Sequence, residues 1–551
     1  MKMKYKVISL FILLVNFIFA SQQEINREER RRREEEFKKL EKEEVFKTEY
    51  PVHQIQEADT ETGSEIKRIE INGNTILSKN QINKLKKKYL GKKGGQNIVN
   101  FVKELENLYL EKGYITTRVK IDMENSDFKA GKIYCVVVEG YIESIRIDGK
   151  EKTVRAFTAF PIKKGDLLNM KELDQGIDNL NSISANNAKL DITAGESFGG
   201  SIIDIKNERN KKISGAINYN NLGQQSTGEE RVKVALTIED FLGINDSFTG
   251  SYQRKLGRNR KYKDTENFSF YYRIPFKYWD FSIIKDQSEY KNTVKGLGQS
   301  YESSGISKNM NYSIRRVLHR NNTGKTSLGI TLTNKETKNY IDDEMLILSS
   351  RKLSVLKVDI GHQRRLLNGM FSGEIAYHEG LKKFGAERDD WEYKDSTSPK
   401  AQFKKYTMDI NWYKPFSIGS YNFSYKFSFS GQYSDDILYS SEKMSIGDDT
   451  TVRGFKENSI MGDKGIYIRN ELAYSYKFIE PFIAYDIGRV KDVTKDDYYE
   501  KYGSELSGAS IGLRMYFKYF TASITYAKPL TAPSYIDKNK QEVYITLSYI
   551  F

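Results

Sequence analysis

The strongest constraint on this chain is the alternation of apolar and polar residues in short segments from residue 212 to residue 551. Residues 421–430, for example, read Tyr-Asn-Phe-Ser-Tyr-Lys-Phe-Ser-Phe-Ser. Such alternation places one class of side chain on each face of a β-strand. These segments predict about sixteen strands with one apolar and one polar face, the pattern of an antiparallel transmembrane β-barrel. The strands of a soluble β-sandwich would show the same alternation of apolar and polar residues, so this fold is the alternative.

The N-terminal residues predict that the chain is exported. Residues 1–20 contain three early lysines, an apolar run from 7 to 19 and a final Ala20, so we expect a signal peptide cleaved near that residue. No later stretch reaches the about eighteen uncharged apolar residues that a spanning helix needs. An exported chain of this kind can cross a bilayer only as a closed sheet, which favours the barrel over the sandwich.

Composition supports the same fold class. The 38 tyrosines and 29 phenylalanines, combined with 29% charged residues, suit an antiparallel sheet with one apolar face. The net charge of +14 is spread along the chain rather than gathered on one element, so no nucleic-acid partner is expected. The single cysteine, Cys135, lies in an apolar run, which predicts a buried structural thiol.

Between the signal peptide and the first folded module lies a strongly charged segment. In residues 27–44 acidic and basic side chains recur at helical spacing, as in Glu34 and Lys38. This pattern predicts a solvated single helix, and a flexible charged spacer is the alternative. Residues 54–64 are expected to be a polar linker.

Residues 65–139 predict a compact module with the order strand, helix, helix, strand, strand. Residues 140–208 repeat that order, and their second helix begins at Asn169, with Glu172 three residues later as in a capping box. A repeated supersecondary order indicates two related modules in tandem.

Three enzyme-like patterns do not support catalysis. Ser197 lies in Gly-Glu-Ser-Phe-Gly, but strands are expected on both sides of it, whereas a nucleophile elbow needs a helix after it. Residues 322–326 resemble half of a P-loop, yet His319 stands where the first glycine is required. We therefore expect no enzyme activity, no cofactor and no metal site. The four histidines have no metal-ligand spacing: His53, His319, His362 and His378.

The interval 435–465 is the longest break in the alternation, and it carries the sequence Val452-Arg453-Gly454-Phe455. Long loops with a compact tip are often functional. In the strand at 482–488, alternation places Asp486 and Gly488 on the lumen side, where a guanidinium has room to reach the carboxylate. Asp486 is therefore the expected counter-charge for Arg453.

Two tandem modules of this order behind a signal peptide resemble POTRA domains. Val-Arg-Gly-Phe at 452–455 and Phe-x-x-x-Asp-x-Gly at 482–488 resemble the paired motifs of the POTRA and β-barrel superfamily, in which the sixth extracellular loop enters the barrel. The final strand, which ends in Phe551, resembles the assembly signal of bacterial outer-membrane barrels. Two modules and a charged N-terminal helix resemble the TpsB family of two-partner-secretion transporters.

The resemblance implies a division of the chain and a function. The expected parts are a signal peptide (1–20), a charged helix and linker (21–64), two POTRA-like modules (65–139 and 140–208) and a barrel (209–551) whose loop 435–465 folds inward. The implied function is secretion of a partner exoprotein across the outer membrane, with an assembly factor for other barrels as the alternative and a passive porin or adhesin as a third hypothesis. The implied partners are the unfolded exoprotein, outer-membrane lipid including lipopolysaccharide, and the barrel assembly machinery.

The resemblance also implies how the parts work. The modules would capture the exoprotein by strand addition to a sheet edge. The contact between Arg453 and Asp486, expected in a wet lumen and therefore of modest energy, would position the loop. The charged helix is either a plug in the barrel or a periplasmic element.

Overall fold

The computed structural model describes residues 20–42, 52–56, 63–257, 263–295, 299–390, 395–494 and 502–551. The expected signal peptide therefore lies outside the described residues, apart from Ala20. Within the described ranges, no helix is both long enough and apolar enough to cross a bilayer.

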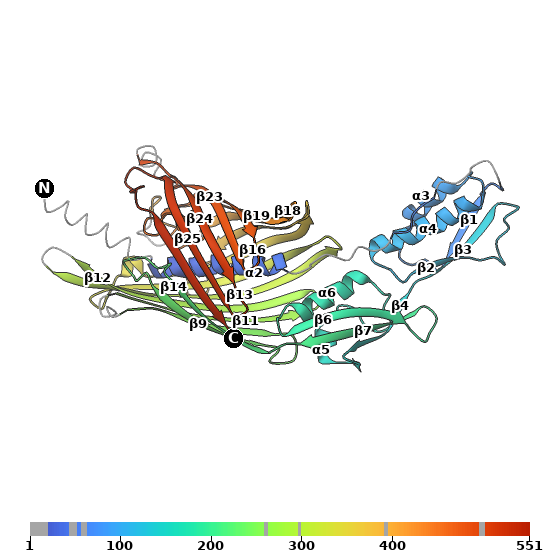
Figure 1. Cartoon of the computed structure of the whole chain (residues 1–551), viewed down its shortest axis with the longest axis horizontal. Coiled ribbons are helices and arrows are strands. Elements are labelled where there is room, and N and C mark those ends of the chain that lie inside the picture. The colour runs from blue at the N-terminus through green and yellow to red at the C-terminus, as the bar shows by residue number, and fades with distance from the viewer. Residues whose placement is uncertain are drawn as a thin grey trace.

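The C-terminal part is a closed antiparallel barrel of sixteen long strands in the described chain, with the two-residue β15 (Glu344–Met345) between β14 and β16 (Figure 1). The prediction of about sixteen strands is confirmed. The strands are β8 (Ile213–Asn220), β9 (Arg231–Glu239), β10 (Ser247–Lys255), β11 (Lys263–Phe276), β12 (Trp279–Lys295), β13 (Ser300–Asn321), β14 (Gly324–Ile341), β16 (Arg351–Leu366), β17 (Gly369–Gly380), β18 (Lys404–Ile418), β19 (Tyr421–Tyr433), β22 (Lys464–Ser475), β23 (Ile479–Lys491), β24 (Glu505–Tyr516), β25 (Phe520–Thr531) and β26 (Glu542–Ile550).

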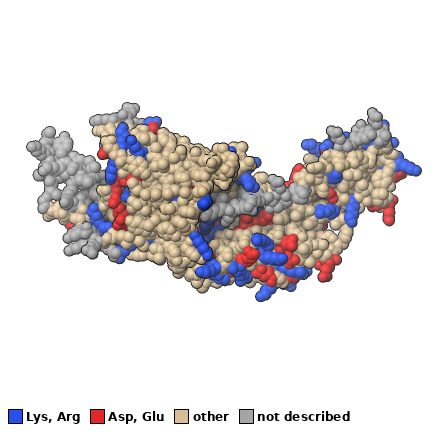
Figure 2. Space-filling model, viewed as in Figure 1, with Lys and Arg blue, Asp and Glu red and all other residues tan. Residues whose placement is uncertain are grey.

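Alternation along these strands separates an outward apolar face from an inward polar face. On β23, Ile483 on the outward face is 58% exposed, whereas Asp486 on the inward face is fully buried. Figure 2 shows the outer wall of the barrel as mostly uncharged on the visible face, with Lys, Arg, Asp and Glu gathered near its ends and over the modules. This distribution suits a wall in contact with lipid.

The barrel closes where β26 pairs with β8. Phe551 continues this pairing, because its N–H donates to the Gly215 carbonyl at 2.9 Å and its carbonyl accepts from the Gly215 N–H at 3.0 Å. A Cβ atom on Gly215 would lie 2.3 Å from the Phe551 ring. The absent side chain at Gly215 therefore makes room for the ring, which stacks on Tyr549.

The first module has a three-stranded sheet of order β1-β3-β2 covered by two helices. Helix α3 begins after Ser78, which forms a capping box with Gln81, and α4 ends at Gly113 in the left-handed conformation that favours glycine. Its elements are β1 (Arg68–Asn72), α3 (Lys79–Tyr89), α4 (Gly95–Lys112), β2 (Arg118–Ile121) and β3 (Lys132–Val138). Cys135 is buried in its core, as predicted.

The second module repeats the order, which confirms the prediction of two modules, and adds one strand of two residues that the sequence did not predict. Its sheet has the order β5-β4-β7-β6, and its N-caps are Thr153 and Asn169. Its elements are β4 (Tyr141–Ile147), β5 (Lys150–Glu151), α5 (Val154–Ala159), α6 (Met170–Asn181), β6 (Asn186–Ala194) and β7 (Gly200–Arg209).

The enzyme-like patterns lie in turns. Residues 195–199 join β6 to β7, and residues 322–323 join β13 to β14. Across the described ranges, no group of three or more His, Cys, Asp or Glu side chains is placed to hold a metal ion.

Two further segments lie inside the barrel. Helix α2 (Ala20–Lys42) runs along the lumen (Figure 1). It begins seven residues before the predicted start at residue 27. The segment 434–463, between β19 and β22, folds inward and forms a small hairpin of β20 (Met444–Ile446) and β21 (Ile460–Gly462).

Candidate functional site in the barrel lumen

The tip of the inward loop packs into the barrel rather than extending into solvent. Val452 and Phe455 are buried in an apolar cluster with Ile446 of the loop, Val490 of β23 and Leu506 of β24. These apolar contacts hold the tip against the wall and fix the direction in which Arg453 points.

The side chain of Arg453 meets the carboxylate of Asp486 on β23. Its Nε lies 2.6 Å from Oδ2 and its Nη2 lies 2.8 Å from Oδ1, while its backbone N–H donates to Oδ2 at 3.2 Å. Two-pronged pairing of this kind is strong and directional. Asp486 has no exposed surface and Arg453 is 5% exposed. The expectation of a wet lumen around this pair was therefore wrong, because the loop tip excludes water from it.

A second carboxylate, Glu471 on β22, completes the site. Arg453 Nη1 donates to it at 3.1 Å, and Arg514 of β24 donates to its other oxygen at 2.6 Å. Arg469, two residues before Glu471 on the same strand, lies 4.0 Å from Asp486 and donates to the Thr450 carbonyl of the loop at 2.9 Å. The sequence reasoning missed Glu471 and Arg469, although alternation along β22 places both on the lumen side.

Small residues allow the loop to approach the wall closely. A Cβ atom on Gly508 of β24 would lie 2.1 Å from the Arg453 carbonyl oxygen, and one on Gly488 would lie 3.0 Å from Ile446 of the loop. Gly454 has φ +105° and donates its N–H to the Tyr544 hydroxyl at 2.9 Å. Gly488 and Gly454 were predicted site residues, whereas Gly508 and Tyr544 were not.

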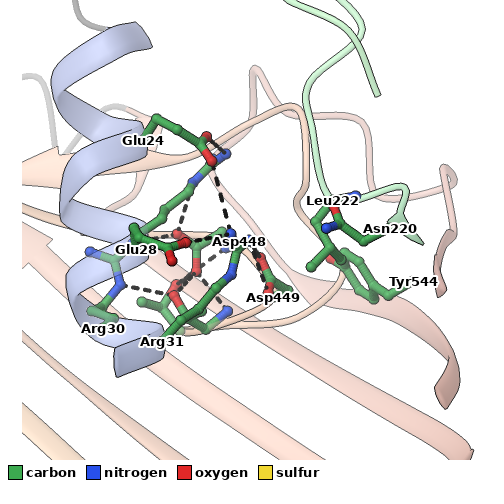
Figure 3. A network of polar contacts seen from close by, with 12 residues as sticks. Glu24, Glu28, Arg30, Arg31, Asn220, Leu222, Asp448, Asp449 and Tyr544 are labelled. Carbon is green, nitrogen blue, oxygen red and sulfur yellow. Dashed lines mark hydrogen bonds and ion pairs between the residues drawn. The ribbon is translucent and has the colours of Figure 1, made fainter. Parts of the chain in front are cut away.

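Helix α2 binds the same loop from the other side. Arg30 Nη2 donates to Asp448 Oδ2 at 2.6 Å, and Arg27 Nε donates to the same oxygen at 3.3 Å. Arg31 Nη2 donates to Asp449 at 3.2 Å. In Figure 3, Arg30 and Arg31 of the helix point toward Asp448 and Asp449, which lie only a few residues before Arg453. The helix, the loop and the barrel wall therefore share one network of charges.

Other charged side chains of α2 bind the wall directly. Arg32 makes a two-pronged contact with Asp286 of β12, at 2.9 and 2.7 Å. Glu24 pairs with Arg231 of β9 at 2.5 Å, and Arg33 pairs with Asp409 of β18 at 3.0 Å. The segment 27–44 was predicted to be a solvated helix, and this was wrong for its first two turns, where Arg27 is buried and Arg30, Arg31 and Arg32 are only partly exposed.

Helix α2 and the inward loop together occupy the lumen of the barrel. A helix with its side chains is about 10–12 Å wide. The side chains of α2 reach β9 and β12 on one part of the wall and β18 on another. The helix and the inward loop thus occupy the path that a polypeptide crossing the barrel would follow.

Comparison with known proteins assigns this architecture. The family model described as haemolysin secretion/activation protein ShlB/FhaC/HecB matches residues 199–515. The chain belongs to this family. A ShlB-type POTRA domain matches residues 64–140, and a further POTRA domain matches residues 141–194.

Similar proteins agree with the ShlB/FhaC/HecB assignment. The chain is 28% identical to the outer membrane transporter CdiB of Dickeya dadantii (strain 3937) over 86% of this chain and 84% of that protein. It is 31% identical to the hemolysin transporter protein ShlB of Serratia marcescens over 72% of this chain and 70% of that protein. The solved structure of CdiB from Escherichia coli is 25% identical and superimposes with a TM-score of 0.84 over 96% of this chain and 97% of that one.

Membership of the ShlB/FhaC/HecB family, known as TpsB, makes the chain an outer-membrane transporter of two-partner secretion with its POTRA domains in the periplasm. The comparisons support this function over that of an assembly factor for other barrels. The modules mark the periplasmic end of the barrel, and the loop and helix fill the lumen between that end and the cell exterior.

Proposed function

We propose that this transporter secretes one partner exoprotein, which passes through the barrel once α2 has left the lumen. The observation that carries this proposal is the binding of α2 to the lumen through charged side chains such as Arg32, which pairs with Asp286 and can exchange this partner for water when the helix leaves. A helix held in this way can leave without unfolding the barrel, because the strands keep their backbone pairing. The relative named as a hemolysin transporter makes a haemolysin-type exoprotein the first candidate.

Capture of the exoprotein is assigned to a sheet edge of the POTRA modules. In the second module, β6 (Asn186–Ala194) is an edge strand of nine residues, and β7 pairs with it on one side. An edge of this length offers backbone donors and acceptors to an extended, unfolded chain with little demand on its sequence. The exoprotein would add to β6 as a further strand.

The pair formed by Arg453 and Asp486 is assigned to positioning. Because it fixes the loop tip to β23 and the loop in turn binds α2 through Asp448, it sets the surface on which the helix rests. We assign the outward apolar face to outer-membrane lipid, including lipopolysaccharide, and the C-terminal residue Phe551 to recognition by the barrel assembly machinery. We also retain the division into residues 1–20, 21–64, 65–139, 140–208 and 209–551 as functional units.

Depletion of the transporter separates secretion from barrel assembly. The culture medium and the outer membrane are both surveyed by quantitative proteomics after depletion. Loss of one large exported protein from the medium, with other outer-membrane barrels unchanged, is the expected result. General loss of barrels from the outer membrane would overturn the proposal in favour of an assembly factor. Restoration by the wild-type gene is the control.

A further inference from the structure

The second POTRA module is hydrogen-bonded to the periplasmic end of the barrel. In the turn between β11 and β12, the Lys277 N–H donates to the Thr158 carbonyl of α5 at 2.7 Å. The Lys277 carbonyl accepts from Asn179 of α6 at 2.7 Å and from Gln175 at 3.2 Å. These contacts fix α5 at the level where β11 ends.

The turn between β9 and β10 is bound to the same module. Arg155 of α5 pairs with Asp240, which is buried. Glu239, the last residue of β9, accepts hydrogen bonds from the backbone of Ser184 at 3.1 Å and of Ala185 at 2.7 Å. Helix α5 therefore joins two neighbouring turns of the barrel through its polar residues.

The apolar residues of α5 and of this turn are left outside these contacts. Val154 and Phe157 of α5 are 65% and 63% exposed, and their spacing of three places them on one side of the helix. Phe241 and Leu242 of the turn are 73% and 58% exposed. We call these four residues the junction patch. Four large apolar side chains exposed around one buried ion pair indicate a contact with an apolar phase.

The junction patch continues the lipid-facing wall. Phe157 packs edge-on against Phe276 at 6.0 Å between ring centroids, and Phe276 ends the outward face of β11, which includes the exposed Phe268. On β9, the exposed Val234 and Leu236 lead along the outward face toward Phe241. Figure 1 shows α5 at the barrel end of the module, beside the ends of these strands.

A cation lies at the edge of this surface. The ammonium of Lys277 lies 4.7 Å from the ring centroid of Phe157 and 5.5 Å from that of Phe276. A lysine whose stem covers aromatic rings while its charge faces water is typical of the boundary between hydrocarbon and lipid head groups.

We propose that the junction patch is seated in the periplasmic leaflet of the outer membrane, with Lys277 at the level of the lipid phosphates. The transporter would then contact the bilayer through its second POTRA module as well as through the barrel. This seat holds the module, and with it the edge strand β6, at a fixed height above the barrel entrance. The inference rests on the outer-membrane location and is independent of which exoprotein is carried.

Site-directed spin labelling of the full chain in lipid nanodiscs tests the proposal. In a Cys135→Ala background, single cysteines replace Phe157 and Leu242 and are labelled with a nitroxide. Phe198→Cys is the matched aqueous control, because Phe198 lies in the hairpin of the same module and is 77% exposed. Leu236→Cys on the barrel wall is the lipid control. Heat-modifiable migration on gels verifies that each labelled barrel is folded.

The readout is the accessibility of each label to oxygen, which concentrates in lipid, relative to a water-soluble nickel chelate. At positions 157 and 242 we expect a ratio several-fold above that at position 198 and close to that at 236. A ratio at 157 and 242 equal to that at 198 would overturn the proposal. Protection from nickel that appears only when exoprotein is added would also overturn it, and would assign the patch to substrate contact.

Discussion

The guanidinium of Arg453 and the carboxylate of Asp486 lie 33 residues apart in the chain and meet in a two-pronged contact of 2.6 and 2.8 Å, buried in the barrel wall. The loop that carries Arg453 also carries Asp448, which binds two arginines of α2. One short segment therefore links the wall of the barrel to the helix that occupies its lumen.

Replacing either member of the buried pair should release the loop. In Asp486→Ala the buried guanidinium keeps its contact with Glu471, and in Arg453→Ala the buried carboxylate keeps Arg469 at 4.0 Å, but both variants lose the two-pronged contact. Breaking a buried pair costs up to about 3–5 kcal/mol. The strands keep their pairing, so we expect an assembled barrel and sharply reduced secretion, measured as exoprotein in the medium against the cell fraction. Arg453→Lys serves as the charge-conserving control and should restore little, because lysine cannot make the two-pronged contact. Normal export by both alanine variants would disprove the positioning role.

The close approach at Gly508 gives a prediction about packing alone. In Gly508→Ala the new methyl group would overlap the Arg453 carbonyl oxygen, so the loop tip must shift away from β24. We expect lower secretion and faster proteolysis of the loop. Gly250→Ala on β10 is the matched control, because the nearest atom to its added Cβ lies 3.8 Å away, and it should behave as wild type. Equal behaviour of the two variants would contradict the close packing of the tip.

Removing the charges between α2 and the loop should open the lumen. In the double variant Arg27→Gln and Arg30→Gln, Asp448 loses both cationic partners, so the bound position of the helix is weakened. We expect higher ion conductance in planar bilayers than in wild type. Glu35→Gln, a change in the exposed second half of α2, is the control and should leave conductance unchanged. Conductance that stays at the wild-type level in the double variant argues against a plug held by these pairs.

The buried thiol of the first module gives a pH-dependent test of its core. Burial raises the pKa of Cys135 to about 11, whereas an unfolded cysteine has a pKa of about 8.5. Because the thiolate is the reactive form, the native thiol should resist alkylation at pH 9 and react after denaturation. The contribution of this group to folding stability is present below the unfolded pKa and is lost as the pH rises toward 11. Phe198→Cys supplies an exposed thiol for comparison, and equal native reactivity at the two positions would place Cys135 outside the core.

Much of the fold was predictable because its signal is local. Alternation along each strand depends on neighbours two residues apart, so it identified all sixteen strands and placed Asp486 on the lumen side. Capping residues such as Ser78 and Asn169 likewise mark helix starts within a few positions. The direction of the loop came from the family resemblance, together with the room that alternation predicts beside Asp486.

The rest depends on contacts between distant segments. The charges of α2 suggested a solvated helix, because nothing in residues 20–42 indicates that their partners lie on β9, β12, β18 and the loop. Glu471 and Arg469 obey the alternation, but so do many other charged lumen residues, and only the three-dimensional position of Arg453 distinguishes them. The sequence around Gly508 does not distinguish it from other glycines of the barrel, because its role depends on the close approach of the Arg453 carbonyl oxygen.

The pairing of β26 with β8 has a consequence for how the barrel is made. Ser548 and Asn218 hydrogen-bond across this seam although 330 residues separate them, so closure is the contact with the longest range in the sheet. Loop-closure entropy makes such contacts slow to form, and until they form two strand edges remain unpaired. Until β26 pairs with β8, the sheet is open and its two unpaired edges can aggregate with other chains. The backbone pairing of Phe551 with Gly215 removes both edges and with them this risk of aggregation.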